Sequence, residues 1–382
     1  MSATGSAGKL LGAAALVGLC GAAATYLVET PTRFWTNYLI WFLFLLTVGL
    51  GTLFMVALEY LVGSVWSVPV RRVPERLASF TLVAGPLALF GLLSLKVIYP
   101  WTQAGAAANP VLAGKAVWLN VPFFAARVVL CLCLWAASYW LLVGGSFKQD
   151  QTRDPAITVR SKRFAPFFMA IFAYSVTVVA FDWISSLEPE WYSDIFGVYL
   201  FAGSFIAGLA ASVLALFYLV GKGRLREVRS DHYYNLGGLL FGFTIFWSYI
   251  GFAQYMLIWY ANMPEEVSWY RLRVQGDWAP VALILAAVHF VIPFFALVSS
   301  RAKNDPTRLK RVAVLALFAH LLDLYWMVYP TLGRGPMPGW PELSFALLFL
   351  GGGLLWARQS MGHGADLPVG DPFLKQGLEF RL

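Results

Sequence analysis

Long apolar runs recur along the whole chain, and short polar stretches separate them. A helix needs about 20 apolar residues to cross the hydrocarbon core of a bilayer. Ten runs reach or approach that length, and no stretch between them is long enough for a soluble domain. The pattern therefore predicts an all-α membrane protein with about ten transmembrane helices. The expected spans are residues 9–28, 36–62, 77–97, 122–143, 165–183, 194–221, 235–260, 279–300, 311–331 and 342–358.

The composition excludes several other classes of protein. Of the 382 residues, 59% are hydrophobic and 13% are charged, whereas soluble domains carry about 25% charged residues. These values exclude an ordinary soluble enzyme, a disordered chain and a nucleic-acid-binding domain. We interpret the net charge of +8 as loops that face an anionic lipid surface, so the lipid bilayer and not nucleic acid is the expected partner.

The distribution of basic residues predicts the orientation of the helices. If the amino-terminus is cytoplasmic, the cytoplasmic segments hold 21 of the 28 lysines and arginines, and the outer segments hold 7. Because cytoplasmic loops carry the excess of positive charge, both termini are expected in the cytoplasm. The first run also resembles a signal peptide that ends near Ala24, but it continues to Val28, which favours a retained helix.

Tryptophan shows the opposite bias. Nine tryptophans fall in predicted outer loops or at outer helix ends, and three fall at the inner side. An aromatic belt should be roughly symmetric. The excess of tryptophan at the outer side therefore has two interpretations: an aromatic belt, or an outer surface that contacts another protein.

A short internal repeat divides the chain. The heptapeptide ALEYLVG at 57–63 recurs as ALFYLVG at 215–221, and this offset of 158 also superimposes the third span on the seventh and the fourth on the eighth. Four spans per repeat give both halves the same orientation, related by an axis along the membrane normal. We expect two four-helix bundles and two peripheral helices. The divisions are 1–32 for the first helix, 33–190 and 191–335 for the bundles, and 336–382 for the last helix and a cytoplasmic tail.

Ionisable side chains inside apolar spans are costly and usually functional. His289 and His320 lie near the middle of consecutive spans, and Asp323 follows His320 on the same helical face. Asp182 ends the fifth span, and Glu59 lies one turn inside the second. The halves differ in chemistry, because Glu59 aligns with Phe217 and His289 aligns with Cys131.

The two histidines allow three interpretations. They could ligate a haem between them, although adjacent helices leave little room. They could form hydrogen bonds that hold the two spans together. They could also form a proton relay, because histidine titrates near neutrality and Asp323 can orient His320. Tyr255, with Thr244 and Ser248 on the seventh span, either forms bonds between helices or lines a wet groove.

Other features of the sequence limit the chemistry. The outer loop 182–194 carries four carboxylates and no base, so it is either a solvated cap, a proton exit or a docking patch for a basic partner. No phosphate loop, zinc pattern or haem-attachment motif is present, and the three cysteines do not form a metal-binding motif. We therefore expect no catalysis by this chain alone, no metal and no cofactor bound to it.

Three segments resemble a known family: DWISSLEPEWYSDIFGVYLFAGS at 182–204, DHYYNLGGL at 231–239 and FAQYMLIWYANMPEEVSWY at 252–270. They are similar to the NrfD-like membrane subunits of bacterial alternative complex III, and to the smaller of the two such subunits in particular. The similarity extends from about 33 to 331. It implies two four-helix bundles in the bacterial cytoplasmic membrane.

The resemblance also implies a function. Such a subunit belongs to a respiratory or photosynthetic quinol:electron-acceptor oxidoreductase that delivers electrons to a cytochrome c or a terminal oxidase. Its implied partners are the larger NrfD-like paralogue, an iron–sulfur subunit, and multi-haem and mono-haem cytochrome c subunits, with menaquinone or quinol bound in the complex. The chain would scaffold the complex and form a proton pathway or a quinone or lipid site; the alternative is a free-standing secondary transporter. The candidate proton-pathway residues are Asp182, Glu59, His289, His320, Asp323 and Tyr255.

Overall fold

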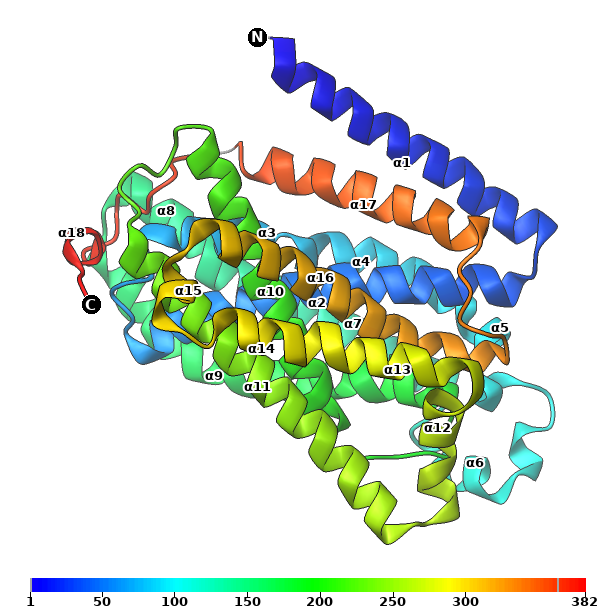
Figure 1. The fold of residues 1–382 in the computed structure, drawn as a ribbon. Coiled ribbons are helices and arrows are strands. Elements are labelled where there is room, and N and C mark those ends of the chain that lie inside the picture. The colour runs from blue at the N-terminus through cyan, green and yellow to red at the C-terminus, as the bar shows by residue number, and fades with distance from the viewer. Residues whose placement is uncertain (1, 363) are drawn as a thin grey trace.

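The computed structural model describes residues 2–362 and 364–382, and all of their regular structure is helical (Figure 1). In these ranges ten helical segments are long and apolar enough to cross a membrane. The prediction of an all-α, multi-pass membrane protein is thus confirmed. The ten segments are Ser6–Val28, Pro31–Val62, Val68–Ile98, Val121–Thr152, Pro155–Leu187, Phe196–Gly221, Ser230–Ala261, Gly276–Leu297, Pro306–Leu332 and Trp340–Ser360.

Several helices extend beyond the apolar runs that predict them. Helix α9 (Pro155–Val179) begins ten residues before its apolar run, and α16 (Pro306–Val328) begins five residues before its own. An Asp-Pro pair starts both helices: the aspartate side chain accepts a backbone N–H of the first turn, and proline fits the first helical position. Local capping therefore sets these two boundaries.

Helices α2 (Pro31–Val62) and α10 (Phe196–Gly221) form the centre of the fold. In the most apolar stretch of α2, 89% of residues are buried inside the protein, and the share for α10 is 72%. Glycines allow their backbones to approach closely, since a Cβ on Gly51 would lie 2.0 Å from the Ser204 carbonyl oxygen. A Cβ on Gly208 would lie 2.5 Å from the carbonyl carbon of Gly51. Only glycine fits at either position.

The other spans pack around this pair in the order of the repeat. Helix α2 contacts α4 (Phe80–Gly91) and α9, while α10 contacts α11 (Ser230–Ala261) and α16. The last helix of each half also contacts the first helix of the other, because α9 packs on α10 and α16 packs on α2. The exact domain boundaries given above stay a prediction.

Two peripheral helices complete the set of spans. Helices α1 (Ser2–Val28) and α17 (Trp340–Ser360) pack side by side, and both contact α2 (Figure 1). Glycines again sit at this contact, since a Cβ on Gly18 would meet the backbone nitrogen of Leu348 at 2.2 Å. The helix pair therefore packs backbone to backbone along one side of the fold.

The two ends of the helices differ in charge. We call the end with α8 (Gly145–Thr152), α15 (Ser300–Asn304) and the tail 364–382 the basic end, and the end with loops 98–121, 182–194 and 262–278 the tryptophan-rich end (Figure 1). At the basic end the tail is held by ion pairs to both halves. Asp366 pairs with Arg76 at 3.0 Å and also with Arg224.

The pairing of Asp366 makes the attachment of the tail depend on pH. Partial burial opposes the charged form of Asp366, but hydrogen bonds from Arg224 and Arg76 outweigh it, so the pKa of this carboxyl lies below its usual value. A carboxyl whose pKa falls on folding stabilises the fold above its unfolded pKa of about 3.9. That contribution is lost as the pH falls through the folded pKa.

We therefore expect the tail to detach in acid. Amide hydrogen-exchange protection of 364–382 should be the same at pH 7 and pH 5 and should drop when the pH is lowered below about 4. Asp366→Asn should show the low protection already at pH 7. Equal protection of the wild type and Asp366→Asn at every pH would mean that these ion pairs do not hold the tail.

Candidate functional site

Three of the candidate residues meet at one buried place. His289 lies in a π-helical turn (Ala287–Val291) between α13 (Ala279–Ala286) and α14 (Ile292–Leu297), and His320 and Asp323 lie on α16. Each residue offers one potential metal-ligand atom, a ring nitrogen or a carboxylate oxygen, and these three atoms lie within 4.8 Å of one another. None of the three residues is more than 2% exposed. We call these residues the His–Asp cluster.

Local sequence explains why His289 lies in a widened turn. Pro293 has no backbone N–H, so it cannot bond to the carbonyl of His289 four residues earlier. A π-helical turn accommodates such a break, and single turns of this kind are frequent at functional sites. The turn places the His289 ring over the indole of Trp247, with ring centres 3.8 Å apart and planes inclined by 27°.

His320 has a hydrogen-bond partner at one of its two ring nitrogens. Its Nε2 lies 2.8 Å from the Thr47 hydroxyl, which also lies 2.8 Å from the Leu43 carbonyl oxygen. When the hydroxyl donates to that carbonyl, its oxygen accepts from Nε2–H and Nδ1 keeps a lone pair. Nδ1 has no hydrogen-bond partner among the described residues, and a Cβ on Gly203 would lie 2.9 Å from it. Gly203 thus leaves space beside a ring nitrogen without a partner.

Asp323 is held by two neutral donors from other helices. Tyr199 on α10 donates to Oδ1 at 2.6 Å, and Trp247 on α11 donates to Oδ2 at 3.1 Å. An indole N–H can only donate, so Oδ2 is an acceptor. Neither donor supplies a positive charge to the carboxylate. Both nitrogens of His289 also have no partner among the described residues.

The arrangement therefore brings three ionisable groups together. One atom each of His289, His320 and Asp323 lies within 4.8 Å of the other two, and Nδ1 of His320 and both nitrogens of His289 have no hydrogen-bond partner among the described residues. Unpaired buried polar atoms are costly. A neutral imidazole has one N–H donor and one acceptor, so a proton shared among the three groups, or a metal ion in its place, would pair atoms that otherwise have no partner.

The first half carries a phenylalanine and a serine at the positions that align with His320 and Asp323. RSKR at 160–163 matches RLKR at 308–311, an offset of 308 − 160 = 148 that aligns His320 with Phe172 and Asp323 with Ser175. Phe172 packs against Phe201 at 5.6 Å, and the Ser175 hydroxyl accepts the Trp135 N–H at 2.9 Å. An aromatic core thus replaces the ionisable residues, and only the second half keeps the site.

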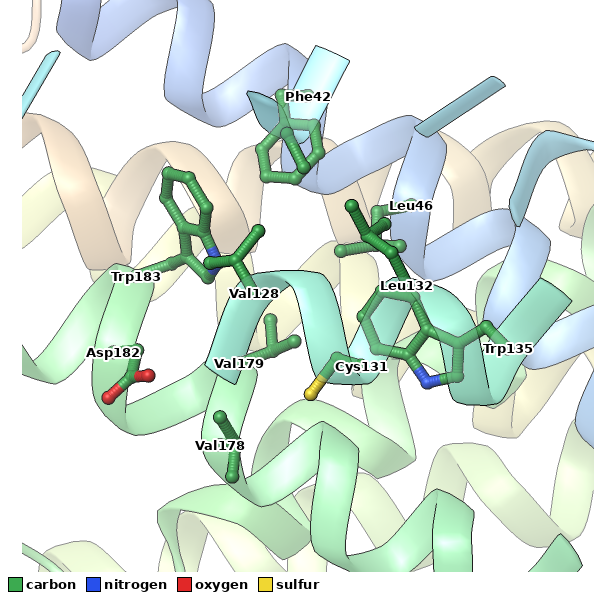
Figure 2. Close-up of a pocket in the computed structure, with 11 residues that line it drawn as sticks. Phe42, Leu46, Val128, Cys131, Leu132, Trp135, Val178, Val179, Asp182 and Trp183 are labelled. Atoms are coloured by element: carbon green, nitrogen blue, oxygen red, sulfur yellow. The ribbon is translucent and has the colours of Figure 1, made fainter. Parts of the chain in front are cut away.

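The position that aligns with His289 lies beside a small cavity in the first half. Cys131 lines a cavity of about 10 Å³ between α7 (Val121–Tyr139) and α9 (Figure 2). A volume of this size holds about one water. Most of the other lining residues are apolar, with Asp182 the one acidic side chain among them. The cavity is too small for a quinone.

Asp182 is not part of the cluster. Its two oxygens accept from Arg127 at 2.7 and 3.0 Å, and one of them also accepts from the Trp118 indole at 2.9 Å. The hydrogen bonds of this carboxylate connect the end of the fifth span to α7 through Arg127 and to the loop before α7 through Trp118. Its place in a proton pathway stays a prediction without support from this geometry.

The acidic outer loop is not an uncompensated patch. The sequence shows no base within 182–194, but bases from other segments reach two of its four carboxylates. Arg127 pairs with Asp182, and Arg273 pairs with Glu188 at 2.5 Å. These two carboxylates are thus already paired within the chain, and the docking of a basic partner on the loop stays a prediction.

Glu59 lies apart from the cluster, at the basic end. It is 6% exposed, and neither carboxyl oxygen has a hydrogen-bond partner among the described residues. Twelve residues separate it from Thr47 on α2, about 18 Å at 1.5 Å per residue. The tight contact at Gly51 lies between the two. No polar connection from Glu59 to the cluster is seen along this helix.

Tyr255 also lies apart from the cluster. Its side chain is 38% exposed, and its ring contacts Tyr270 at 5.2 Å. Thr244 bonds back to the Leu240 carbonyl of its own helix at 2.8 Å, so it does not join two helices by its hydroxyl. Gln254 does link segments, because it bonds to Ser193 and Tyr270.

Sequence reasoning missed four residues of the site. Thr47, Tyr199, Gly203 and Trp247 come from three further helices and carry no charge, so a search for ionisable residues does not find them. A threonine within a long apolar run was the one available signal. Their roles become visible only when the helices are packed.

The fold and the site define a polytopic all-α membrane protein with a buried His–Asp cluster in its second half, where Thr47 of the first half also reaches it. Neither a scan against models of known protein families nor a search of curated proteins finds a match to this chain.

Proposed function

We propose that this chain is an integral membrane subunit of a quinol:electron-acceptor oxidoreductase, in which the His–Asp cluster takes up and releases protons. The observation that carries the proposal is the convergence of His289, His320 and Asp323 within 4.8 Å of one another inside the membrane-spanning region. Ionisable groups at such depth often mark proton relays. Histidine is suited to this role because its ordinary titration range includes neutral pH.

The resemblance to NrfD-like subunits of alternative complex III supports the assignment to an oxidoreductase. In that arrangement the chain scaffolds the complex beside a larger paralogue, and the iron–sulfur and cytochrome c subunits carry the electrons. The tryptophan-rich end suits a contact with these subunits, because aromatic residues are enriched in the cores of protein interfaces. Quinone binding in the complex is part of the same proposal.

The orientation is also proposed. The 21-to-7 distribution of basic residues supports an orientation with the basic end and both termini in the cytoplasm. The resemblance described above supports the cytoplasmic membrane of a bacterial cell. A reporter inserted at Lys148, which is exposed on α8, should report the cytoplasm, and one at Ala107 should report the outer side. Signals from the same side would contradict this topology.

Copurification tests the proposed function. A tagged chain extracted gently from its native membrane should bring a second NrfD-like subunit, an iron–sulfur protein and c-type cytochromes, identified by mass spectrometry and haem absorbance. The purified assembly should oxidise quinol. Extraction of the chain as a lone protein from membranes that retain quinol oxidation would favour the transporter alternative.

A further inference from the structure

The donor atoms of the His–Asp cluster are those of a known type of metal site. Zinc binds imidazole nitrogens and carboxylate oxygens, and catalytic zinc sites use three protein ligands with a fourth position left open. Two histidines and one carboxylate also suit other divalent transition metals. His289, His320 and Asp323 supply this set from two consecutive spans, and all three are buried.

Neighbouring side chains orient the donors as they do in metal sites. Metal-binding histidines usually donate their other ring N–H to an oxygen, which fixes the tautomer. Thr47 can accept Nε2–H of His320 in this way. The Nδ1 without a partner lies on the side of Gly203, where an added Cβ would be 2.9 Å from Nδ1 and 3.8 Å from Asp323 Oδ2. Tyr199 and Trp247 donate hydrogen bonds to the two oxygens of Asp323 and so fix its carboxylate.

The spacing requires only a small closure around an ion. At zinc–ligand distances of about 2.0–2.1 Å, the ligand atoms of a tetrahedral site lie roughly 3.4 Å apart. The donor atoms here lie within 4.8 Å of one another. The His289 ring stacks on Trp247 and makes no hydrogen bond with the described residues, so no such bond would have to break when an ion binds.

From this geometry we propose that His289, His320 and Asp323 form a binding site for one divalent transition-metal ion, with zinc as the best match. The ion would supply the positive charge that the neutral partners of Asp323 do not. The proposal concerns this chain alone and does not depend on its assignment to an oxidoreductase. An ion bound to these three side chains would take the place of the exchangeable proton, so the ion-loaded cluster would not act as the proton relay proposed above.

Cobalt is the probe, because tetrahedral Co²⁺ has strong visible absorption bands whereas hydrated Co²⁺ absorbs weakly. The full chain carries a tag without histidine and the changes Cys20→Ser and Cys133→Ser, which remove the two exposed thiols. It is produced in medium with Co²⁺, so that the ion is present while the helices assemble. We expect one Co²⁺ per chain with tetrahedral bands, and Zn²⁺ should abolish those bands.

Variants connect the bound ion to these residues. His289→Gln, His320→Gln and Asp323→Asn should each remove the tetrahedral bands. Thr47→Val keeps all three donors but loses the oxygen that orients His320, so we expect roughly 10- to 100-fold weaker binding. Gly203→Ala adds a methyl group 2.9 Å from Nδ1 and should also block the ion.

Gly242→Ala on α11 is the matched control, because its Cβ would meet nothing within 4 Å. Each variant is compared with the parent protein for helical content and monodispersity. If a variant of His289, His320 or Asp323 fails to fold, Thr47→Val and Gly203→Ala still test the site. Absence of bound Co²⁺ in the folded parent protein would overturn the proposal. Retention of the tetrahedral Co²⁺ bands in Gly203→Ala, and in those of His289→Gln, His320→Gln and Asp323→Asn that fold, would also overturn the proposal.

Discussion

Asp323→Asn should leave the complex assembled and reduce coupled quinol oxidation and proton release about 100-fold or more, in the range of a lost proton-transfer group. The amide keeps the local contacts, since its oxygen can accept from Trp247 and its NH₂ can donate to the Tyr199 hydroxyl oxygen. It removes the group that exchanges a proton. Rates and proton yields are measured in reconstituted vesicles, with haem content as the measure of assembly.

Ser175→Ala is the matched control for this prediction. Ser175 is the buried residue that aligns with Asp323 in the first half, where it bonds to Trp135. Its loss should leave turnover close to that of the wild type. Equal rates and equal proton yields for Asp323→Asn and the wild type would reduce the cluster to a structural contact between helices.

Gly51→Leu should prevent stable folding. The position of its Cβ coincides with the backbone of α10, 2.0 Å from the Ser204 oxygen, so α2 and α10 would have to separate. Overpacking of a core side chain costs about 1–3 kcal/mol, and a clash with backbone on the central helix pair should fall at or above the upper end of that range. The expected result is little or no monodisperse protein after extraction.

Gly242→Leu provides the comparison. This glycine is exposed on α11, and its Cβ would have open space, so a leucine there should face lipid at little cost. Fluorescence-detected size exclusion after stepwise heating compares the two variants with the wild type. The same melting temperature for Gly51→Leu and Gly242→Leu would mean that the close approach of α2 and α10 is not required.

The number of spans could be predicted from sequence because one physical requirement dominates it. Each crossing needs about 20 apolar residues, and a chain with 13% charged residues leaves few ways to divide those runs. The meeting of His289, His320 and Asp323 could be predicted in part, because consecutive spans usually touch and both histidines fall near mid-span. Helix ends set by Asp154 and Asp305 could not be placed from hydrophobicity alone.

The partners of the buried charges could not be predicted, because they come from distant parts of the chain. Arg127 lies 55 residues from Asp182, and Arg273 lies 85 residues from Glu188. No local pattern indicates such pairs. The same holds for Thr47, which reaches His320 across 273 positions of sequence. Packing of the helices creates these contacts, and the Arg273–Glu188 and Thr47–His320 contacts form where one half packs on the other.

The most direct test of the central claim is a reaction-induced infrared difference spectrum of the reconstituted complex, recorded between its oxidised and quinol-reduced states. If the His–Asp cluster exchanges a proton during turnover, the wild type should show carboxyl or imidazole bands that shift in D₂O. Those bands should be missing from Asp323→Asn and present in Ser175→Ala. Superimposable spectra of the wild type and Asp323→Asn would contradict the account.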